Sequence, residues 1–179
     1  MKAEDLIRAC KQNDRKAQRV FFERHVNIML AICIRYVKKF EDAEDVMLTG
    51  FQKFFDKINT FEFRGNGSEK AFLKKIMVNE CLMLLRQQKH FLYQNEMLDN
   101  IIDAEATSLD KLAADDIFNY IVQLPAGYRT VFNLYVLENM SHKEIAIELN
   151  ISEGTSKSQL NKARKALQQM IEKDSIINL

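Results

Sequence analysis

Residues 140–167, MSHKEIAIELNISEGTSKSQLNKARKAL, carry the signals of two short helices joined by a tight turn. Ser141 and Glu144 have the spacing of a capping box, in which the serine caps an amide three residues on and the glutamate reaches back. Apolar residues then recur at helical spacing up to Leu149, and Asn150 tolerates the left-handed conformation that often ends a helix. The first of the two helices is therefore predicted to run between Ser141 and Asn150.

The second helix is predicted to start after Ser152, which can cap it, and to bury Leu160, Ala163 and Leu167. Its outer side has four cations, no acid, and polar side chains able to hydrogen-bond base edges. These residues are Lys157, Ser158, Gln159, Asn161, Lys162, Arg164 and Lys165. A polar and basic second helix is typical of a helix-turn-helix that reads the DNA major groove. A packed helical pair whose basic face is only solvated is the alternative.

The composition favours a helical, soluble globular protein. The chain has five glycines and one proline in 179 residues, so it has few of the residues that favour turns. Hydrophobic residues make up 47% of it, as is usual for a globular protein. Its length suits one domain or two small ones. The net charge of +1 would argue against nucleic-acid binding if the charges were evenly spread.

Several classes of function find no support in the sequence. The three cysteines are too few and too widely spaced for a disulfide framework or a metal site, which indicates reduced, buried thiols in a cytoplasmic protein. They are Cys10, Cys33 and Cys81. The chain has neither a glycine-rich phosphate loop nor a GxSxG motif, and no apolar run could span a bilayer. We expect no catalytic residue, metal, cofactor, small-molecule substrate or membrane insertion.

The N-terminal part predicts two amphipathic helices. Residues 4–10 can form a short helix that buries Leu6, Ile7 and Cys10. The longer helix that follows has apolar side chains on more than one side, so it is expected to pack centrally.

A third helix is predicted from Asp42, which can cap it, while Glu44 and Asp45 place negative charge where the helix dipole favours it. Its inward positions are Val46, Gly50, Phe54 and Ile58. On the residues alone, this is a core helix with an acidic start.

The loop at 59–67 carries two aromatic residues, Phe61 and Phe63, beside Arg64. Both rings are expected to be exposed. Aromatic rings next to a cation suit stacking on an unpaired base, and they suit packing of the loop onto a core equally well.

A helix capped by Ser68 is predicted to continue to His90. Its expected stripe is Phe72, Ile76, Asn79, Met83 and Arg86. Asn79 and Arg86 interrupt the apolar face, so each must find a partner or face solvent. Cations outnumber the single acid between residues 74 and 89, and such a patch can neutralise phosphates. The cations are Lys74, Lys75, Arg86 and Lys89.

The composition changes after residue 90. Residues 91–116 contain seven acidic residues and a single basic one, Lys111. Such a stretch is typical of a linker. Ser108 is predicted to cap the first helix of the following domain, with Ile117 and Ile121 on its inner face. The predicted organisation is a domain at 1–90, an acidic linker at 91–107 and a second domain at 108–179.

The C-terminal part resembles the promoter-reading domain of extracytoplasmic-function (ECF) sigma factors of bacterial RNA polymerase. The resemblance is carried by Leu124-Pro125, Tyr128-Arg129, Lys143-Glu-Ile-Ala146, Ser152-Glu-Gly-Thr155, Lys157-Ser158 and Ala163-Arg-Lys165. Response-regulator output domains share part of this pattern. Asp42-Ala-Glu-Asp-Val46, followed by Gly50-Phe51 and Lys53, resembles the sigma segment that docks on the clamp helices of the polymerase. The likeness covers roughly residues 6–167.

The resemblance implies contact residues in both domains. The polymerase-binding set would be Asp42, Asp45, Leu48, Thr49, Phe51 and Lys53. Leu48 and Thr49 stand where the family usually has Gln and Glu. The segment from the loop at 59–67 to His90 resembles the part of sigma factors that opens the upstream promoter element and captures flipped bases. Phe61 and Asn79 match positions of the pocket that holds those bases. We assign Lys75 and Arg86 to strand phosphates by their charge and place.

In the predicted recognition helix, we expect groove contacts from Lys157, Ser158, Asn161 and Lys162, and phosphate contacts from Gln159, Arg164 and Lys165. The family tends to place Val at position 156, on the buried side. Ser156 should therefore cost some packing unless its hydroxyl bonds back to the helix.

The sequence thus predicts an all-α protein of two small helical domains joined by an acidic linker. The resemblance implies an alternative sigma factor that binds core RNA polymerase and promoter DNA, acts in the cytoplasm and is restrained by an anti-sigma factor. The linker would thread toward the polymerase active centre and mimic nucleic acid there, or serve as a solvated tether. A helix-turn-helix regulator without polymerase contact and a helical interaction module are the alternative functions.

Overall fold

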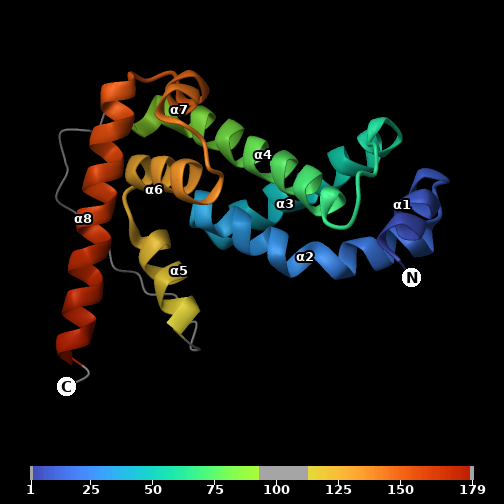
Figure 1. Ribbon diagram of the computed structural model, residues 1–179, viewed down its shortest axis with the longest axis horizontal. Helices are drawn as coiled ribbons and strands as arrows, with labels where there is room; N and C mark the ends of the chain where they lie inside the picture. The colour runs from blue at the N-terminus through green and yellow to red at the C-terminus, as the bar shows by residue number, and fades with distance from the viewer. Residues whose placement is uncertain (1, 93–112, 178–179) are drawn as a thin grey trace. The chain divides into compact units, whose positions relative to one another are not determined.

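The computed structural model describes the backbone of residues 2–92 and 113–177 and the side chains of residues 2–88 and 116–174 (Figure 1). The predicted all-α fold is confirmed, and the described ranges contain no strand. The chain divides into two compact units, unit 1 (Met1–Leu98) and unit 2 (Asp99–Leu179). The predicted linker at 91–107 falls almost wholly outside the described residues, so its boundaries and its role stay predictions. None of the described helices is long and apolar enough to cross a membrane.

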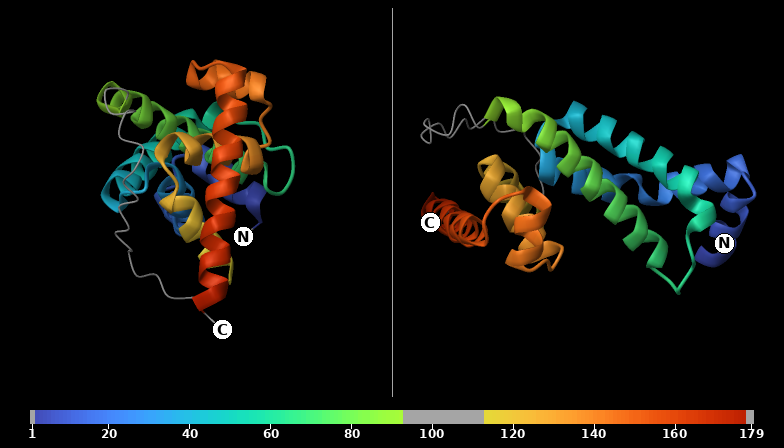
Figure 2. Two further views of the ribbon diagram at one scale, coloured as in Figure 1. Left: turned by 90° about the vertical axis from the view of Figure 1, so that its left-hand side faces the viewer. Right: turned by 90° about the horizontal axis from the view of Figure 1, so that it is seen from above.

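Unit 1 is built on three long helices that all pack on one another. Its elements are α1 (Ala3–Lys11), α2 (Arg15–Val37), α3 (Phe40–Lys57), the 3₁₀ turn η1 (Ile58–Thr60) and α4 (Ser68–Leu92). Figure 2 shows α2, α3 and α4 running lengthwise beside one another, and α1 packs on α2 and η1. Within unit 1, this arrangement leaves one side of α3 and one side of α4 exposed.

The core of unit 1 uses the predicted inward residues of α1 and α3. Leu6, Ile7 and Cys10 are buried, as are the four inward positions predicted for the third helix. At Gly50, α3 and α4 approach so closely that an added Cβ would overlap Sδ of Met77. A larger residue here would therefore require Met77 to move.

Two predicted helix starts in unit 1 are wrong. Helix α3 begins at Phe40, so Asp42 lies in its first turn, where it favours the helix through the dipole. The early start follows from a sharp turn at Lys38, whose φ is 68°. Ser68 is the first residue of α4, and its hydroxyl bonds into the preceding loop, where it accepts from the N–H of Arg64 (3.1 Å) and donates to the carbonyl of Gly65 (2.7 Å).

The predicted inner face of α4 is also wrong. The buried residues are Leu73, Met77, Val78, Cys81, Leu82 and Leu85. Asn79, Met83 and Arg86 are exposed instead. Helix α4 has two neighbouring apolar stripes, and the stripe without an amide or a guanidinium is buried because burying those groups costs free energy.

Unit 2 is organised around its last helix, which contacts the three other α-helices of the unit. Its elements are α5 (Ala113–Gln123), α6 (Ala126–Phe132), the π-helical turn η2 (Asn133–Leu137), α7 (His142–Leu149) and α8 (Glu153–Ile177). The expected cap at Ser108 lies outside the described residues. Ile121 is buried as predicted, but Ile117 is 55% exposed, contrary to prediction.

The local signals for the helix-turn-helix are confirmed. Ser141 and Glu144 form the complete capping box of α7, and Asn150 ends that helix with φ at 53°. The N–H of Thr155 donates to Oγ of Ser152 over 2.9 Å, which caps α8. Because these interactions are local, the turn between α7 and α8 is set by its own residues.

The capping box makes the stability of unit 2 depend on pH. Hydrogen bonds from the hydroxyl and the backbone N–H of Ser141 hold the pKa of Glu144 below its ordinary 4.5. The ionised carboxylate therefore stabilises the folded state above pH 4.5, and this contribution is lost as the pH falls through the lowered pKa. We expect Glu144→Gln to lower the melting temperature more at pH 7 than at about pH 4, because below 4.5 the contribution of the carboxylate is already being lost.

Thermal melts of the full chain followed by circular dichroism check this expectation. Glu148→Gln is the matched control, because Glu148 lies in the last turn of the same helix, where a negative charge opposes the dipole. An equal effect of Glu144→Gln at both pH values would contradict the prediction.

Candidate nucleic-acid interface

The outer face of α8 presents the predicted recognition residues to solvent. Six of the seven are exposed, and only Gln159 is half-buried. Its side-chain amide lies over Gly127 of α6, 3.2 Å from where a Cβ would stand. Leu160 and Ala163 are buried on the opposite side, while Leu167, also predicted to be buried, is only half-buried. The predicted division of this helix into two faces is confirmed up to Ala163.

Three cations of this face are held by neighbouring groups. Lys162 Nζ lies 5.6 Å from the centre of the Tyr128 ring, and the Arg164 guanidinium lies 5.8 Å from the centre of the Tyr135 ring. Lys157 makes an exposed ion pair within the helix. Such contacts contribute about 1 kcal/mol or less at exposed sites, so the cations are oriented but can still turn to a phosphate.

The buried hydroxyl of Ser156 is hydrogen-bonded to a residue that the sequence did not indicate as its partner. It is completely buried, and its Oγ lies 2.9 Å from Nδ1 of His142 on α7, where the two atoms share a hydrogen bond. We expected Ser156 to cost some packing unless its hydroxyl bonded back to its own helix, and the bond goes to a different helix instead. Because the partners are 14 residues apart on different helices, no local spacing rule could have paired them.

In unit 1, a polar stripe runs along α4. Lys75, Asn79 and Arg86 are all exposed. Offsets of four and eleven residues place them within about 40° of one another around the helix and about 16 Å apart along it. The stripe thus presents two cations and an amide on one side of α4, and their contact with a nucleic-acid strand stays a prediction.

Phe61 lies elsewhere than expected. Its side chain is only 7% exposed, and its ring stacks on Phe72 of α4 with 5.0 Å between ring centres. Phe63 is half-buried. The expectation of an exposed Phe61 is wrong because the aromatic face of α4 provides a packing surface. A base contact by Phe61 stays a prediction, and it would use the edge of the ring or follow a movement of the loop.

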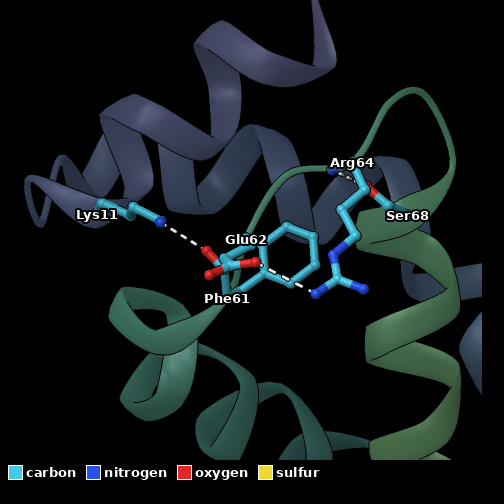
Figure 3. Close-up of polar contacts among 5 residues, drawn as sticks. All are labelled: Lys11, Phe61, Glu62, Arg64 and Ser68. Atoms are coloured by element: carbon cyan, nitrogen blue, oxygen red, sulfur yellow. Dashed lines mark hydrogen bonds and ion pairs between the residues drawn. The ribbon is translucent and has the colours of Figure 1, made fainter.

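The loop after Phe61 is tied down at both ends (Figure 3). Lys11 of α1 donates through Nζ to the carbonyl of Phe61 over 2.6 Å, and Ser68 holds the other end. Arg64 pairs with Glu62 at 3.2 Å on the surface. Gly65, at φ 109°, takes a conformation that other residues rarely adopt. The side chains of the loop are therefore presented on a fixed backbone.

Removing the ammonium of Lys11 should loosen this loop. Lys11→Met is expected to destabilise unit 1 by about 1.5 kcal/mol, the contribution of a hydrogen bond to a charged group. Amide hydrogen exchange should become faster for residues 62–67 and stay unchanged in the core of α2. Lys16→Met, at an exposed position of α2, is the control. Unchanged exchange in the loop would contradict the prediction.

Four of the six predicted polymerase-binding residues lie on the outer side of α3, and they are Asp42, Asp45, Leu48 and Thr49. Asp42, Asp45 and Thr49 line a surface pocket of about 230 Å³ together with side chains of α4. Those side chains are Glu80, Met83, Leu84 and Gln87. Leu48 is 52% exposed. The surface thus combines three carboxylates, those of Asp42, Asp45 and Glu80, with the exposed side chain of Leu48.

The other two residues of this set are engaged inside unit 1. Phe51 is 3% exposed and packs on Phe22, with 4.7 Å between ring centres. Lys53 Nζ forms an ion pair of 2.7 Å with Glu80 of α4. These residues fix α3 against its neighbours, and direct polymerase contacts by them stay predictions.

Comparison with known proteins identifies both units. The family model for sigma-70 region 2 matches residues 21–91, and the model for sigma-70 region 4 matches residues 114–167. The chain is 25% identical over 180 residues to the ECF RNA polymerase sigma-E factor of Haemophilus influenzae, covering 93% of this chain and 94% of that protein. It is also 25% identical over 179 residues to the ECF RNA polymerase sigma factor SigW of Bacillus subtilis, covering 92% and 94%.

A solved structure supports the same fold. The sigma factor RpoE from Bartonella quintana, in complex with the anti-sigma factor NepR, matches with a TM-score of 0.51 and 22% identity, over 86% of this chain and 96% of that one. The match to sigma-70 region 2 does not favour the alternative function, a helix-turn-helix regulator that makes no contact with the polymerase. With both sigma-70 regions present in order and relatives matched over nearly their whole length, the chain belongs to the ECF sigma factors of bacterial RNA polymerase.

Proposed function

We propose that this sigma factor holds core RNA polymerase through the α3 surface and contacts promoter DNA at two places, with α8 in a major groove and the α4 stripe on an opened strand. The observation that carries the proposal is the outer face of α8. It offers seven polar or basic side chains from a helix whose start and opposite face are fixed by α7 and α6. Such a helix suits groove entry.

The division of roles within α8 follows from side-chain chemistry. Ser158 and Asn161 can bond base edges, and Lys162 can donate to guanine. Lys157 also belongs to the groove set. Gln159, Arg164 and Lys165 are assigned to phosphate oxygens, contacts that position the protein without reading sequence.

In this proposal the chain has no catalytic residue of its own, and the polymerase performs the chemistry in the cytoplasm. An anti-sigma factor is proposed as a further partner, supported by the complex formed by the Bartonella quintana relative. The α3 surface and the α8 face are both exposed here. A restraining protein would therefore have to cover at least one of them.

Transcription in vitro tests the proposal. The purified chain is added to core RNA polymerase from a related bacterium with a library of genomic fragments, and the RNA 5′ ends are sequenced. Starts that share a two-part motif upstream are the expected result. No enrichment, together with no co-purification with core polymerase, would overturn the proposal and would point to Leu48 and Thr49 as the decisive departures.

A pair of variants separates base reading from phosphate contact. Asn161→Ala should cost about 1–3 kcal/mol at one base pair and relax the preference there. Lys165→Ala should weaken binding to all sequences alike and reduce the slope of log K against log salt by about 1. Both are measured with holoenzyme on the selected promoter and its single-base variants. Equal losses on all sequences for Asn161→Ala would contradict its assignment.

A further inference from the structure

Four side chains join the elements that surround the start of α8. The first contact lies in the π-helical turn η2, a kind of turn that recurs at functional sites. Tyr135 in this turn stacks on His142 of α7, with 4.6 Å between ring centres and 24° between ring planes. The ring of His142 is thereby held flat against η2.

The second contact links α7 to α8. His142 Nδ1 and Ser156 Oγ are 2.9 Å apart, and Ser156 has no exposed surface. A hydroxyl buried in this way loses free energy unless it is hydrogen-bonded, so the pairing strongly prefers one arrangement. An apolar side chain at this position would fill the space without fixing a direction.

The third contact returns from α8 to η2. The Arg164 guanidinium lies over the Tyr135 ring, at 5.8 Å. Ser156 and Arg164 are eight residues apart, which is about 12 Å along the helix. Helix α8 therefore contacts the same aromatic pair at two levels, through a buried hydrogen bond at Ser156 and a weaker, exposed contact at Arg164. The buried bond is the one that restricts the orientation of the helix.

We propose that Tyr135, His142 and Ser156 are positioning residues that set the orientation of α8, so that base readout depends on them although none of them is assigned to DNA. The proposal rests on the proposed function of α8 in promoter reading. Base contacts need placement to about 0.5 Å, which packing alone does not guarantee. The polar side chains of α8 that read bases all follow Ser156 within two turns, so a small rotation there moves each of them.

Ser156→Val is the sharpest test. Valine suits a buried site and matches the family's usual residue. Removal of the buried hydroxyl should offset the loss of the bond to half-buried His142, so the melting temperature should stay close to that of the wild type. Discrimination between the selected promoter and its single-base variants at the pairs facing α8 should nevertheless fall about fivefold, the lower end of what a base contact contributes. A purely structural role predicts that stability and discrimination change together.

Substitutions of His142 separate the two interactions of its ring. His142→Phe keeps the stacking on Tyr135 but leaves the Ser156 hydroxyl without its partner, so it should lower both stability and discrimination. His142→Asn keeps a polar atom near the position of Nδ1 and should restore part of the discrimination. The double variant His142→Phe/Ser156→Ala should recover stability but not discrimination.

The measurement is transcription by holoenzyme on the promoter selected from the genomic library and on its variants. A wild-type protein that selects no promoter would overturn the proposed function, and this inference with it. Wild-type selection with unchanged discrimination in Ser156→Val and His142→Phe would overturn this inference alone. A fall in discrimination for folded Ser156→Val, with partial rescue by His142→Asn, would support it.

Discussion

Phe54→Ala is expected to destabilise unit 1 by about 3–5 kcal/mol, the usual cost of removing a buried aromatic side chain. Phe54 is completely buried and stacks on Phe21 of α2, with 4.6 Å between ring centres and 9° between ring planes. It also contacts Phe72 of α4, at 5.8 Å. One ring thus touches both of the other long helices, and an alanine would leave a cavity between all three.

The same substitution should loosen the start of the loop at residues 61–67, which is proposed to contact DNA. Phe72 stacks on Phe61, so loss of the Phe54 ring removes the support behind the start of the loop. Denaturant unfolding of the full chain, with hydrogen exchange to separate the two units, measures the effect. Phe40→Ala is the matched control, because Phe40 lies on the same helix and is 49% exposed. Similar losses for both variants would contradict the cavity argument.

Arg129→Met should destabilise unit 2 by about 2 kcal/mol. Arg129 is 4% exposed and donates through one guanidinium nitrogen to the carbonyls of Val122 (3.1 Å) and Leu124 (2.7 Å), where α5 ends. Methionine would leave these carbonyls without that donor. The loss is partly offset because burial disfavours the charged guanidinium, which lowers the pKa of Arg129 to about 10.

The functional consequence of Arg129→Met should be large, because α6, which carries Arg129, packs on α8. Promoter-specific transcription should fall with the stability of unit 2, while co-purification with core polymerase through unit 1 is retained. Lys173→Met, at an exposed position of α8, should change neither. Loss of polymerase binding in Arg129→Met would contradict the division of labour between the units.

Features set by neighbouring residues were predictable from the sequence. The capping box at Ser141, the left-handed Asn150 and the buried face of α3 all follow from spacing along one helix. The outer face of α8 was predictable for the same reason, since its cations and amides share one side of a strongly patterned helix.

Features set by tertiary contacts were not predictable. Helix α4 offers two apolar stripes, and the one that carries Met77 is buried against α2 and α3 while Met83 is exposed. The cost of burying Asn79 and Arg86 favours this choice, but the stripe pattern alone did not reveal it. Phe61 is drawn inward by Phe72, which is eleven positions away. The pairing of His142 with Ser156 depends on how α7 crosses α8, and a single sequence carries no signal for it.

The close approach of α3 and α4 at Gly50 should link the evolution of positions 50 and 77. Any side chain there would occupy the space of Met77 Sδ, so a larger residue at 50 is tolerated only if residue 77 becomes smaller or turns away. Among related chains, we expect the two positions to change jointly, and a bulky residue at 50 to be accompanied by a small one at 77. The contact between α3 and α4 should thus be readable as covariation in an alignment.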